Sequence, residues 1–154
     1  LFEGGDAWLP TGDLFRVDAD GDHWLIGSVQ SLIRTPQGAT PPIPVQDVLD
    51  RLDEVHLSVA YPVVQDDGTT AVAVAVSLCP GVGADLANLA PRVDQAVQVL
   101  APRDRPRYVR VVEESPRTTW YRVRTGPLRN EGLPADGSVL VLDDDTGTYR
   151  PLTG

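Results

Sequence analysis

The chain has 154 residues, 42% of them hydrophobic, which is enough for one globular domain with a sizeable core. Its 22 acidic and 13 basic residues give a formal net charge of -9, which argues against a nucleic acid or an anionic membrane surface as the main partner. The apolar runs are far shorter than the ~20 residues that span a bilayer, so we expect no membrane span. A lone cysteine, Cys79, cannot form an internal disulfide, and we expect a cytoplasmic protein.

Two residue types are missing from the composition. All 13 basic residues are arginine, so no lysine is present to act as an amine nucleophile or to clamp a phosphate. Arginine-only basicity beside many Ala, Val, Asp, Gly and Pro residues predicts a GC-rich genome. Because the chain contains no methionine and begins at Leu1, we expect it to be part of a longer protein.

The first elements expected along the chain are two strands, at residues 14–17 and 23–29. They flank the turn 18–22, whose Asp-Gly pair favours a tight hairpin. The turn is rich in aspartate but lacks the long loop and distal glutamate of a calcium site, so we expect no metal site there. The first 29 residues therefore contain a β-hairpin.

A proline-rich segment and a helix follow. Residues 32–34 form a short strand candidate, and residues 35–44 contain four prolines and one glycine, so we expect an irregular loop there. Apolar residues then recur at helical spacing, and proline is well placed in the first turn. This pattern predicts a helix over residues 44–53.

The remaining pattern predicts a mixture of strands and one long helix. Asp85 is placed to cap a helix over residues 85–100, and the Ala-Val alternation before it predicts a strand that is buried on both faces or lies against small residues. The order of elements indicates an α+β (α/β) domain without the regular alternation of a doubly wound sheet. The expected strands lie at residues 55–64, 70–79, 108–112, 139–142 and 148–152, and the last two form a closing hairpin.

Charge is distributed unevenly along the chain. Residues 1–54 carry ten acidic residues and three arginines, whereas eight of the 13 arginines lie between Arg103 and Arg129. Two interpretations remain open: a set of solvated surface arginines, or a surface that meets phosphates.

Several ordered motifs resemble one superfamily. Thr11-Gly-Asp-Leu-Phe15, with Asp20-Gly21, Trp24 and Gly27, resembles the end of the large domain of adenylate-forming acyl-CoA synthetases. Residues 43–49 resemble the first helix of their small C-terminal domain, and residues 115–122 resemble its catalytic loop. The resemblance implies that residues 1–29 are the last hairpin of the large domain, 30–31 the hinge, and 32–154 the C-terminal domain with a closing hairpin at 138–153.

Motifs in the second half of the chain indicate one subgroup of this superfamily. Residues 118–122, 128–132, 139–143 and 149–153 are together similar to long-chain and very-long-chain fatty acyl-CoA ligases, including the fatty-acid transport protein group. The fold that this resemblance implies is a short β-hairpin followed by a mixed three-stranded sheet with flanking helices.

The resemblance implies a two-step reaction. A fatty acid carboxylate attacks the α-phosphate of ATP to give an acyl-adenylate, and the thiol of CoA then displaces AMP. ATP, CoA and the fatty acid are the implied substrates, and Mg enters only with ATP. The implied partner is the N-terminal adenylation domain of the same protein, so the chain alone is not expected to be active.

Site residues follow from the same motifs. Asp13 matches the aspartate that binds the ribose hydroxyls of AMP, and Ser28 occupies a nucleotide-binding position where the family usually has arginine. Gln30 and Ser31 fall at the hinge pair. Arg122 stands in place of the adenylation lysine, which preserves the charge but not the shape of the side chain.

The glycine loop that lines the CoA tunnel in family members is also altered. Gln37 replaces its first glycine and Pro36 stiffens it, while Gly38 is retained and allows pantetheine to approach the backbone. Arg103, Arg105, Arg107 and Arg124 are interpreted as ordinary surface arginines rather than ligands of the CoA phosphates. The altered positions leave two alternatives: a non-catalytic paralogue that has lost the lysine, or an interaction module that reuses the fold.

Overall fold

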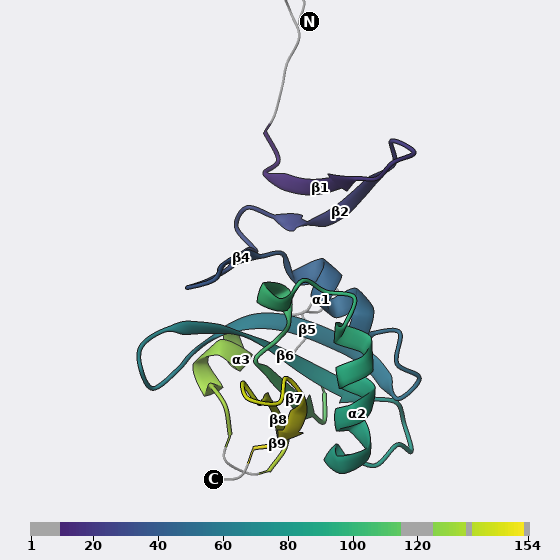
Figure 1. Cartoon of the computed structure of the whole chain (residues 1–154), viewed down its shortest axis with the longest axis vertical. Coiled ribbons are helices and arrows are strands. Elements are labelled where there is room, and N and C mark those ends of the chain that lie inside the picture. The colour runs from purple at the N-terminus through teal and green to yellow at the C-terminus, as the bar shows by residue number, and fades with distance from the viewer. Residues whose placement is uncertain (1–9, 115–124, 135–136, 153–154) are drawn as a thin grey trace, which may run out of the picture.

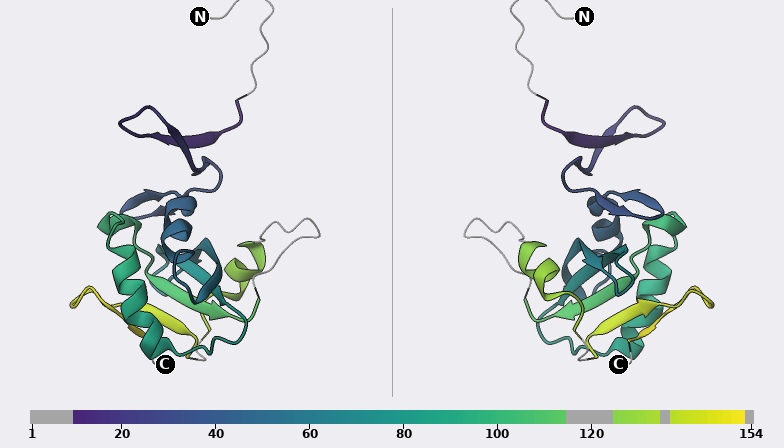
Figure 2. Two further views of the ribbon diagram at one scale, coloured as in Figure 1. Left: turned by 90° about the vertical axis from the view of Figure 1, so that its right-hand side faces the viewer. Right: turned by 90° about the vertical axis from the view of Figure 1, so that its left-hand side faces the viewer.

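The computed structural model describes residues 10–114, 125–134 and 137–152. Figure 1 shows a β-hairpin near the N-terminus, followed by a sheet with helices on both sides. The two side views agree that α1 and α2 cover one face of the sheet and α3 the other (Figure 2). No helix in the described ranges is long and apolar enough to cross a membrane.

The N-terminal hairpin consists of β1 (Asp13–Val17) and β2 (His23–Ser28), as the sequence predicts. Asp18 organises its turn: Oδ1 accepts the backbone N–H groups of Asp20 and Asp22, each at 3.0 Å, and Oδ2 accepts the Trp24 indole at 2.7 Å. Both carboxylate oxygens are therefore used within the turn. Four large apolar side chains of this hairpin are about half exposed: Phe15, Val17, Trp24 and Leu25.

A second hairpin replaces the expected irregular loop. β3 (Ile33–Thr35) pairs with β4 (Gly38–Thr40) through a turn at Pro36 and Gln37, so the expectation of no regular structure over 35–44 is wrong. Pro36 sits in the turn, where it removes no ladder hydrogen bond, and the other prolines come after β4. α1 (Pro42–Leu49) consequently begins and ends earlier than predicted, with proline at its first position.

The sheet is mixed and has five strands in the order β5-β6-β7-β8-β9. β6 and β7 run parallel, and the other neighbours are antiparallel. The α+β fold class and the mixed three-stranded unit β5-β6-β7 are confirmed, and the closing hairpin adds two more strands because β8 pairs with β7. The strands are β5 (Val55–Val64), β6 (Thr70–Leu78), β7 (Tyr108–Val112), β8 (Val139–Leu142) and β9 (Tyr149–Pro151).

The Ala-Val alternation of β6 sorts side chains onto the two faces of the sheet. Val72, Val74 and Val76 pack with the residues of α1 and α2, whereas the alanines of the strand face α3. The small alanine side chains leave room for Tyr61 and for Leu128 of α3, both almost fully buried. This strand is buried on both faces, as predicted.

The helices frame the sheet. α2 (Leu86–Val97) is capped by Asp85, whose carboxylate accepts the N–H groups of Ala87 at 3.0 Å and Asn88 at 3.3 Å. A short 3-10 turn, η1 (Pro102–Asp104), leads from α2 towards β7. α3 (Thr125–Glu131) was not predicted, because Leu128 is its one buried residue and so short a segment shows no periodic stripe.

Candidate functional site

Asp13 and Ser28 lie directly opposite each other at the open end of the N-terminal hairpin. The Asp13 N–H donates to the hydroxyl of Thr11 at 3.2 Å. Within the described residues, the Asp13 carboxylate has no hydrogen-bond partner, so both oxygens can accept from a diol. The hairpin thus brings together the two positions assigned to the nucleotide.

The expected hinge is a tight turn closed by two serines. The Ser28 N–H donates to the Ser31 hydroxyl at 2.8 Å, and that hydroxyl donates to the Ser28 carbonyl at 3.0 Å. The Ser31 N–H also donates to the Ser28 carbonyl, at 3.0 Å. Gln30 lies in this turn and is exposed. Ser28 therefore has a backbone role in the turn besides any contact with a nucleotide.

Gly27 holds the hairpin close to α1. Its φ of +144° is rarely adopted by residues with a side chain, and an added Cβ would lie 3.0 Å from the Ser31 hydroxyl and 3.1 Å from the Pro42 ring. A glycine is therefore required where β2 enters the turn. Gly27 has no evident role in the sequence beyond its place in the superfamily motif, and that place is the one signal for it.

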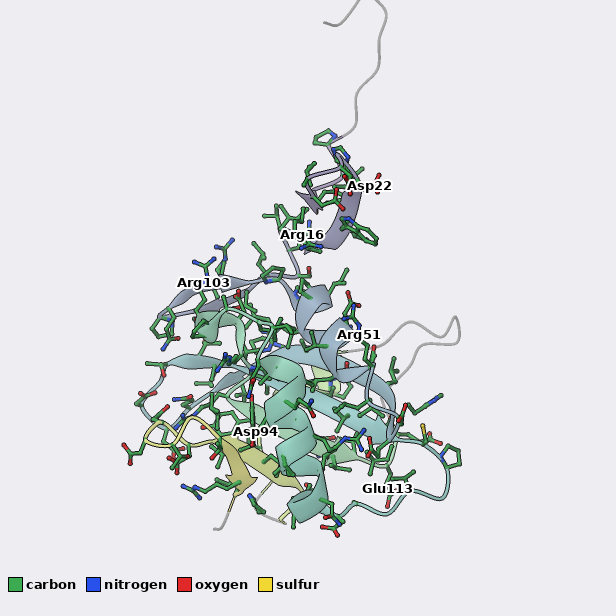
Figure 3. The ribbon with its side chains drawn as sticks, turned by 45° about the vertical axis from the view of Figure 1, so that its right-hand side comes forward. Arg16, Asp22, Arg51, Asp94, Arg103 and Glu113 are labelled. Atoms are coloured by element: carbon green, nitrogen blue, oxygen red, sulfur yellow. The ribbon has the colours of Figure 1, made fainter. Side chains whose placement is uncertain are left out.

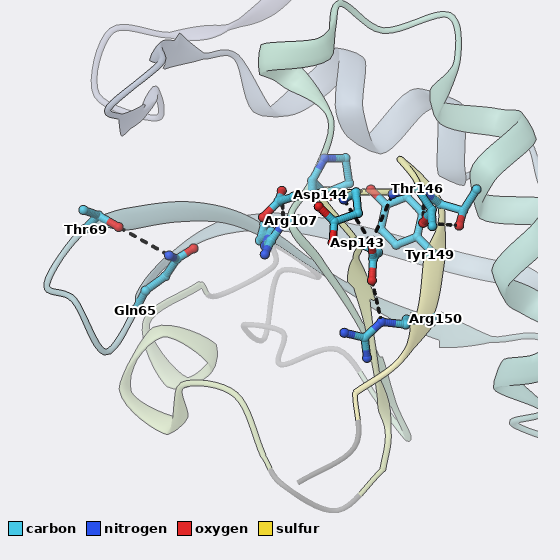
Figure 4. Close-up of polar contacts among 11 residues, drawn as sticks. Gln65, Thr69, Arg107, Asp143, Asp144, Thr146, Tyr149 and Arg150 are labelled. Atoms are coloured by element: carbon cyan, nitrogen blue, oxygen red, sulfur yellow. Dashed lines mark hydrogen bonds and ion pairs between the residues drawn. The ribbon is translucent and has the colours of Figure 1, made fainter.

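A groove of about 430 Å³ lies on the domain, at the end of the sheet where β5 joins β6. Its walls come from segments far apart in the sequence: the β3-β4 turn, the β5-β6 turn, η1, the start of β7, and the closing hairpin. Figure 4 shows the last of these walls, where Arg107 meets Asp144. The polar and charged residues lining the groove are Thr35, Gln37, Gln65, Thr69, Thr70, Arg103, Arg105, Arg107 and Asp144.

The arginines of the groove retain unused hydrogen-bond donors. Arg103 is exposed, with its nearest carboxylate oxygen, on Asp104, 3.8 Å away, and it points outward in Figure 3. Arg105 donates from Nη2 to the Gln98 carbonyl at 3.5 Å, and its buried Nε has no partner in the part of the chain that the structure describes. Three guanidinium groups on one groove form a site suited to phosphate oxygens.

The altered glycine loop borders the same groove. Pro36 and Gln37 line it, and Gly38 follows directly, with a φ of +134° and open space around its Cα. The structure thus brings the predicted CoA residue next to Arg103, Arg105 and Arg107, while Asp13 and Ser28 lie on the separate N-terminal hairpin. Arg122, Arg124 and the catalytic loop 115–122 lie outside the described residues.

Metal ligands are not evident in the described ranges, where no group of three or more His, Cys, Asp or Glu side chains could hold an ion.

Sequence and fold comparisons agree on one superfamily, although no protein-family model matches the chain. The chain is 31% identical to the mouse long-chain fatty acid transport protein 3 over 160 aligned residues, which cover 99% of the chain and 23% of that protein. It is 40% identical over 45 residues to a mouse long-chain-fatty-acid–CoA ligase, which covers 29% of the chain and 6% of the ligase. The crystal structure of the anthranilate CoA ligase AuaEII in complex with anthranoyl-AMP shares the fold, with a TM-score of 0.74 and 23% identity, over 83% of this chain and 25% of that one.

The chain belongs to the adenylate-forming acyl-CoA synthetase superfamily. The match is to a C-terminal part, and the chain spans less than a quarter of the transport protein, at 23% of its length. The resemblance recognised in the motifs, including the fatty acid transport protein subgroup, is confirmed.

Proposed function

We propose that the chain is the C-terminal portion of a fatty acyl-CoA synthetase. In the proposed reaction, ATP activates a fatty acid to an acyl-adenylate and the acyl group is then transferred to CoA. The observation that carries this proposal is the match to a long-chain fatty acid transport protein along 99% of the chain. The partner is an N-terminal adenylation domain of the same protein, and we place the enzyme in the bacterial cytoplasm.

Asp13 and Ser28 are proposed to contact the nucleotide. The carboxylate of Asp13, which has no hydrogen-bond partner among the described residues, can accept two hydrogen bonds from the ribose hydroxyls, and its charge strengthens both. Ser28 supplies only a neutral hydroxyl, whose oxygen lies 3.2 Å from the Ser31 N–H. Its contribution to nucleotide binding is therefore smaller than that of an arginine at this position.

The groove is proposed to hold the phosphates of CoA. Phosphate groups suit the donors of Arg103, Arg105 and Arg107, and the neighbouring Gly38 allows the pantetheine arm to pass close to the backbone. Polar side chains on the β5-β6 turn, Gln65 and Thr69, add neutral hydrogen-bonding groups to the same groove. The domain then serves the second half of the reaction through this groove.

Arg122 is proposed to act in the first half, at the position of the superfamily's adenylation lysine. A guanidinium can neutralise the charge that develops on the phosphate oxygens, although it is larger and planar. The turn containing Gln30 and Ser31 is the proposed hinge about which the domain changes position between the two steps.

The test uses the protein that carries both domains, as wild type and as Arg122→Lys. Fatty-acid-dependent pyrophosphate release and acyl-CoA formation are measured separately across several chain lengths. Acyl-CoA formation by the wild type, with no faster adenylation in Arg122→Lys, supports the ligase. Wild-type inactivity that Arg122→Lys relieves would instead indicate a paralogue that binds without catalysing.

A further inference from the structure

The closing hairpin β8-β9 is anchored to the domain by several polar contacts. The hydroxyl of Tyr149, which is 5% exposed, donates to the Pro106 carbonyl, and its N–H donates to Asp94 at 2.8 Å. Asp143 accepts from Arg150 at 2.9 Å and from the backbone of its own turn. These contacts fix the position of the turn that carries Asp144.

Asp144 is the acidic residue that this turn places on the groove. Its Oδ1 pairs with Nη1 of Arg107, while its side chain remains 78% exposed, against 30% for Arg107. Within the described residues its carboxylate has no other partner, whereas Asp143 and Asp104 are both engaged in fold contacts, Asp104 through Thr40 at 3.0 Å. In the ion pair between Arg107 and Asp144, the carboxylate is therefore exposed and is fixed by no second contact among the described residues.

The electrostatics of Arg107 favour an anion next to it. Partial burial lowers the pKa of Arg107, but the hydrogen bonds and charges of Asp144 and, to a smaller extent, Tyr108 together outweigh burial, and the pKa is raised overall. A phosphate in the same place would offer more negative charge and more acceptor oxygens than a carboxylate. Asp144 and a phosphate ligand are thus competitors for one guanidinium.

We propose that Asp144 is a built-in counter-ion of the groove, which occupies Arg107 in the free domain and is displaced from it by a phosphate of CoA. This inference rests on the proposed function, because it takes the groove to be the CoA phosphate site. Breaking the Asp144–Arg107 pair costs the same free energy for every anion that binds Arg107, so Asp144 weakens the binding of each of them.

The test compares Asp144→Asn with Asp145→Asn in the full chain. Asp145 lies in the same turn and is exposed, and among the described contacts only its backbone N–H is engaged, with Asp143 at 3.0 Å. Both changes remove one negative charge, so their difference isolates the contact with Arg107. Binding of CoA and of inorganic phosphate is followed by NMR titration at low salt, with Arg105→Gln as the variant that weakens the groove itself.

We expect Asp144→Asn to bind CoA about two- to five-fold more tightly than Asp145→Asn, as for loss of a competing exposed ion pair. The increase in affinity for inorganic phosphate, again comparing Asp144→Asn with Asp145→Asn, should be at least as large as the increase for CoA. Equal CoA affinity in the two variants, or weaker binding by Asp144→Asn, would overturn the counter-ion role of Asp144. The CoA site itself would still stand if Arg105→Gln reduces the affinity for CoA. Titrations in which CoA shifts no groove resonance in any variant would overturn the CoA site and the counter-ion together.

Discussion

Ser28 and Ser31 bind each other in both directions across the turn that joins the hairpin to the domain. Each serine supplies a hydrogen-bond donor and an acceptor to the other, with donor-acceptor distances of 2.8 to 3.2 Å. Two small residues thereby close the proposed hinge turn through hydrogen bonds within four residues. These hydrogen bonds involve no buried core residue, so breaking them removes no core contact.

Removing the Ser31 hydroxyl should loosen this turn. In Ser31→Ala the Ser28 N–H loses its acceptor, so we expect its amide hydrogen to exchange roughly fivefold faster, corresponding to about 1 kcal/mol. Ser28→Ala is the matched control, because its backbone N–H can still donate to the Ser31 hydroxyl. Equal exchange rates in the two variants would show that the hydroxyl of Ser31 does not hold the turn.

A methyl group at Gly27 should separate the hairpin from α1. Gly27→Ala combines an unfavourable φ with contacts of 3.0 and 3.1 Å to Ser31 and Pro42, and we expect a cost of about 1 to 3 kcal/mol. Gly21→Ala has a positive φ but no atom within 4 Å of its new Cβ, so it should cost less. Hydrogen exchange of the β1-β2 amides measures both, and similar losses of protection would contradict the steric account.

The two buried tyrosines should respond differently to loss of the hydroxyl. Tyr149→Phe leaves the Pro106 carbonyl without its donor and should lower the free energy of unfolding by about 1 to 2 kcal/mol. Tyr61 is fully buried, and its hydroxyl has no hydrogen-bond partner among the described residues. Burial raises the pKa of Tyr61, and Arg110 opposes that shift mainly through its charge. Tyr61→Phe should therefore change stability by no more than about 0.5 kcal/mol, and urea denaturation of both variants checks the contrast.

Asp143 should make the closing hairpin sensitive to acid. The hydrogen bond from Arg150, followed by the N–H groups of Thr146 and Asp145, lowers the pKa of Asp143 from 3.8 to about 2. Because the folded-state pKa is below the unfolded one, the contribution is complete above pH ~4 and is lost as the pH falls towards 2. Asp143→Asn should lose less stability than the wild type over that interval, whereas Asp145→Asn should follow the wild type. Parallel pH profiles for the wild type and Asp143→Asn would contradict this assignment.

The sequence predicted correctly those helices and strands whose signals lie within a few neighbouring residues. The Ala-Val alternation of β6 and the capping carboxylate of Asp85 act within a few residues, and both elements form as expected. The β3-β4 hairpin was missed because its prolines lie in the turn and after the second strand, where they interrupt no pairing. The addition of β8 to the edge of β7 depends on contacts between distant segments, which periodicity does not report.

The candidate site residues also fall into two groups: those that a local motif places together and those that only the fold brings together. Asp13 and Ser28 are neighbours through one hairpin, so a local motif was enough to place them together. The groove needs Gln37, Arg105 and Asp144, which come together only after the sheet has formed. Along the sequence Arg103, Arg105 and Arg107 resemble a solvated surface cluster, and their place on the lining of one groove is a property of the fold.

The most direct measurement separates the two half-reactions in the protein that carries both domains, with Arg105→Gln as the variant. If the groove holds the CoA phosphates, fatty-acid-dependent pyrophosphate release should stay near the wild-type rate while acyl-CoA formation falls about tenfold or more at subsaturating CoA, corresponding to loss of a charge-assisted hydrogen bond. Arg51→Gln, on the exposed surface after α1, should leave both rates unchanged. Equal losses in the two half-reactions, or no loss in either, would contradict the assignment of this domain to CoA.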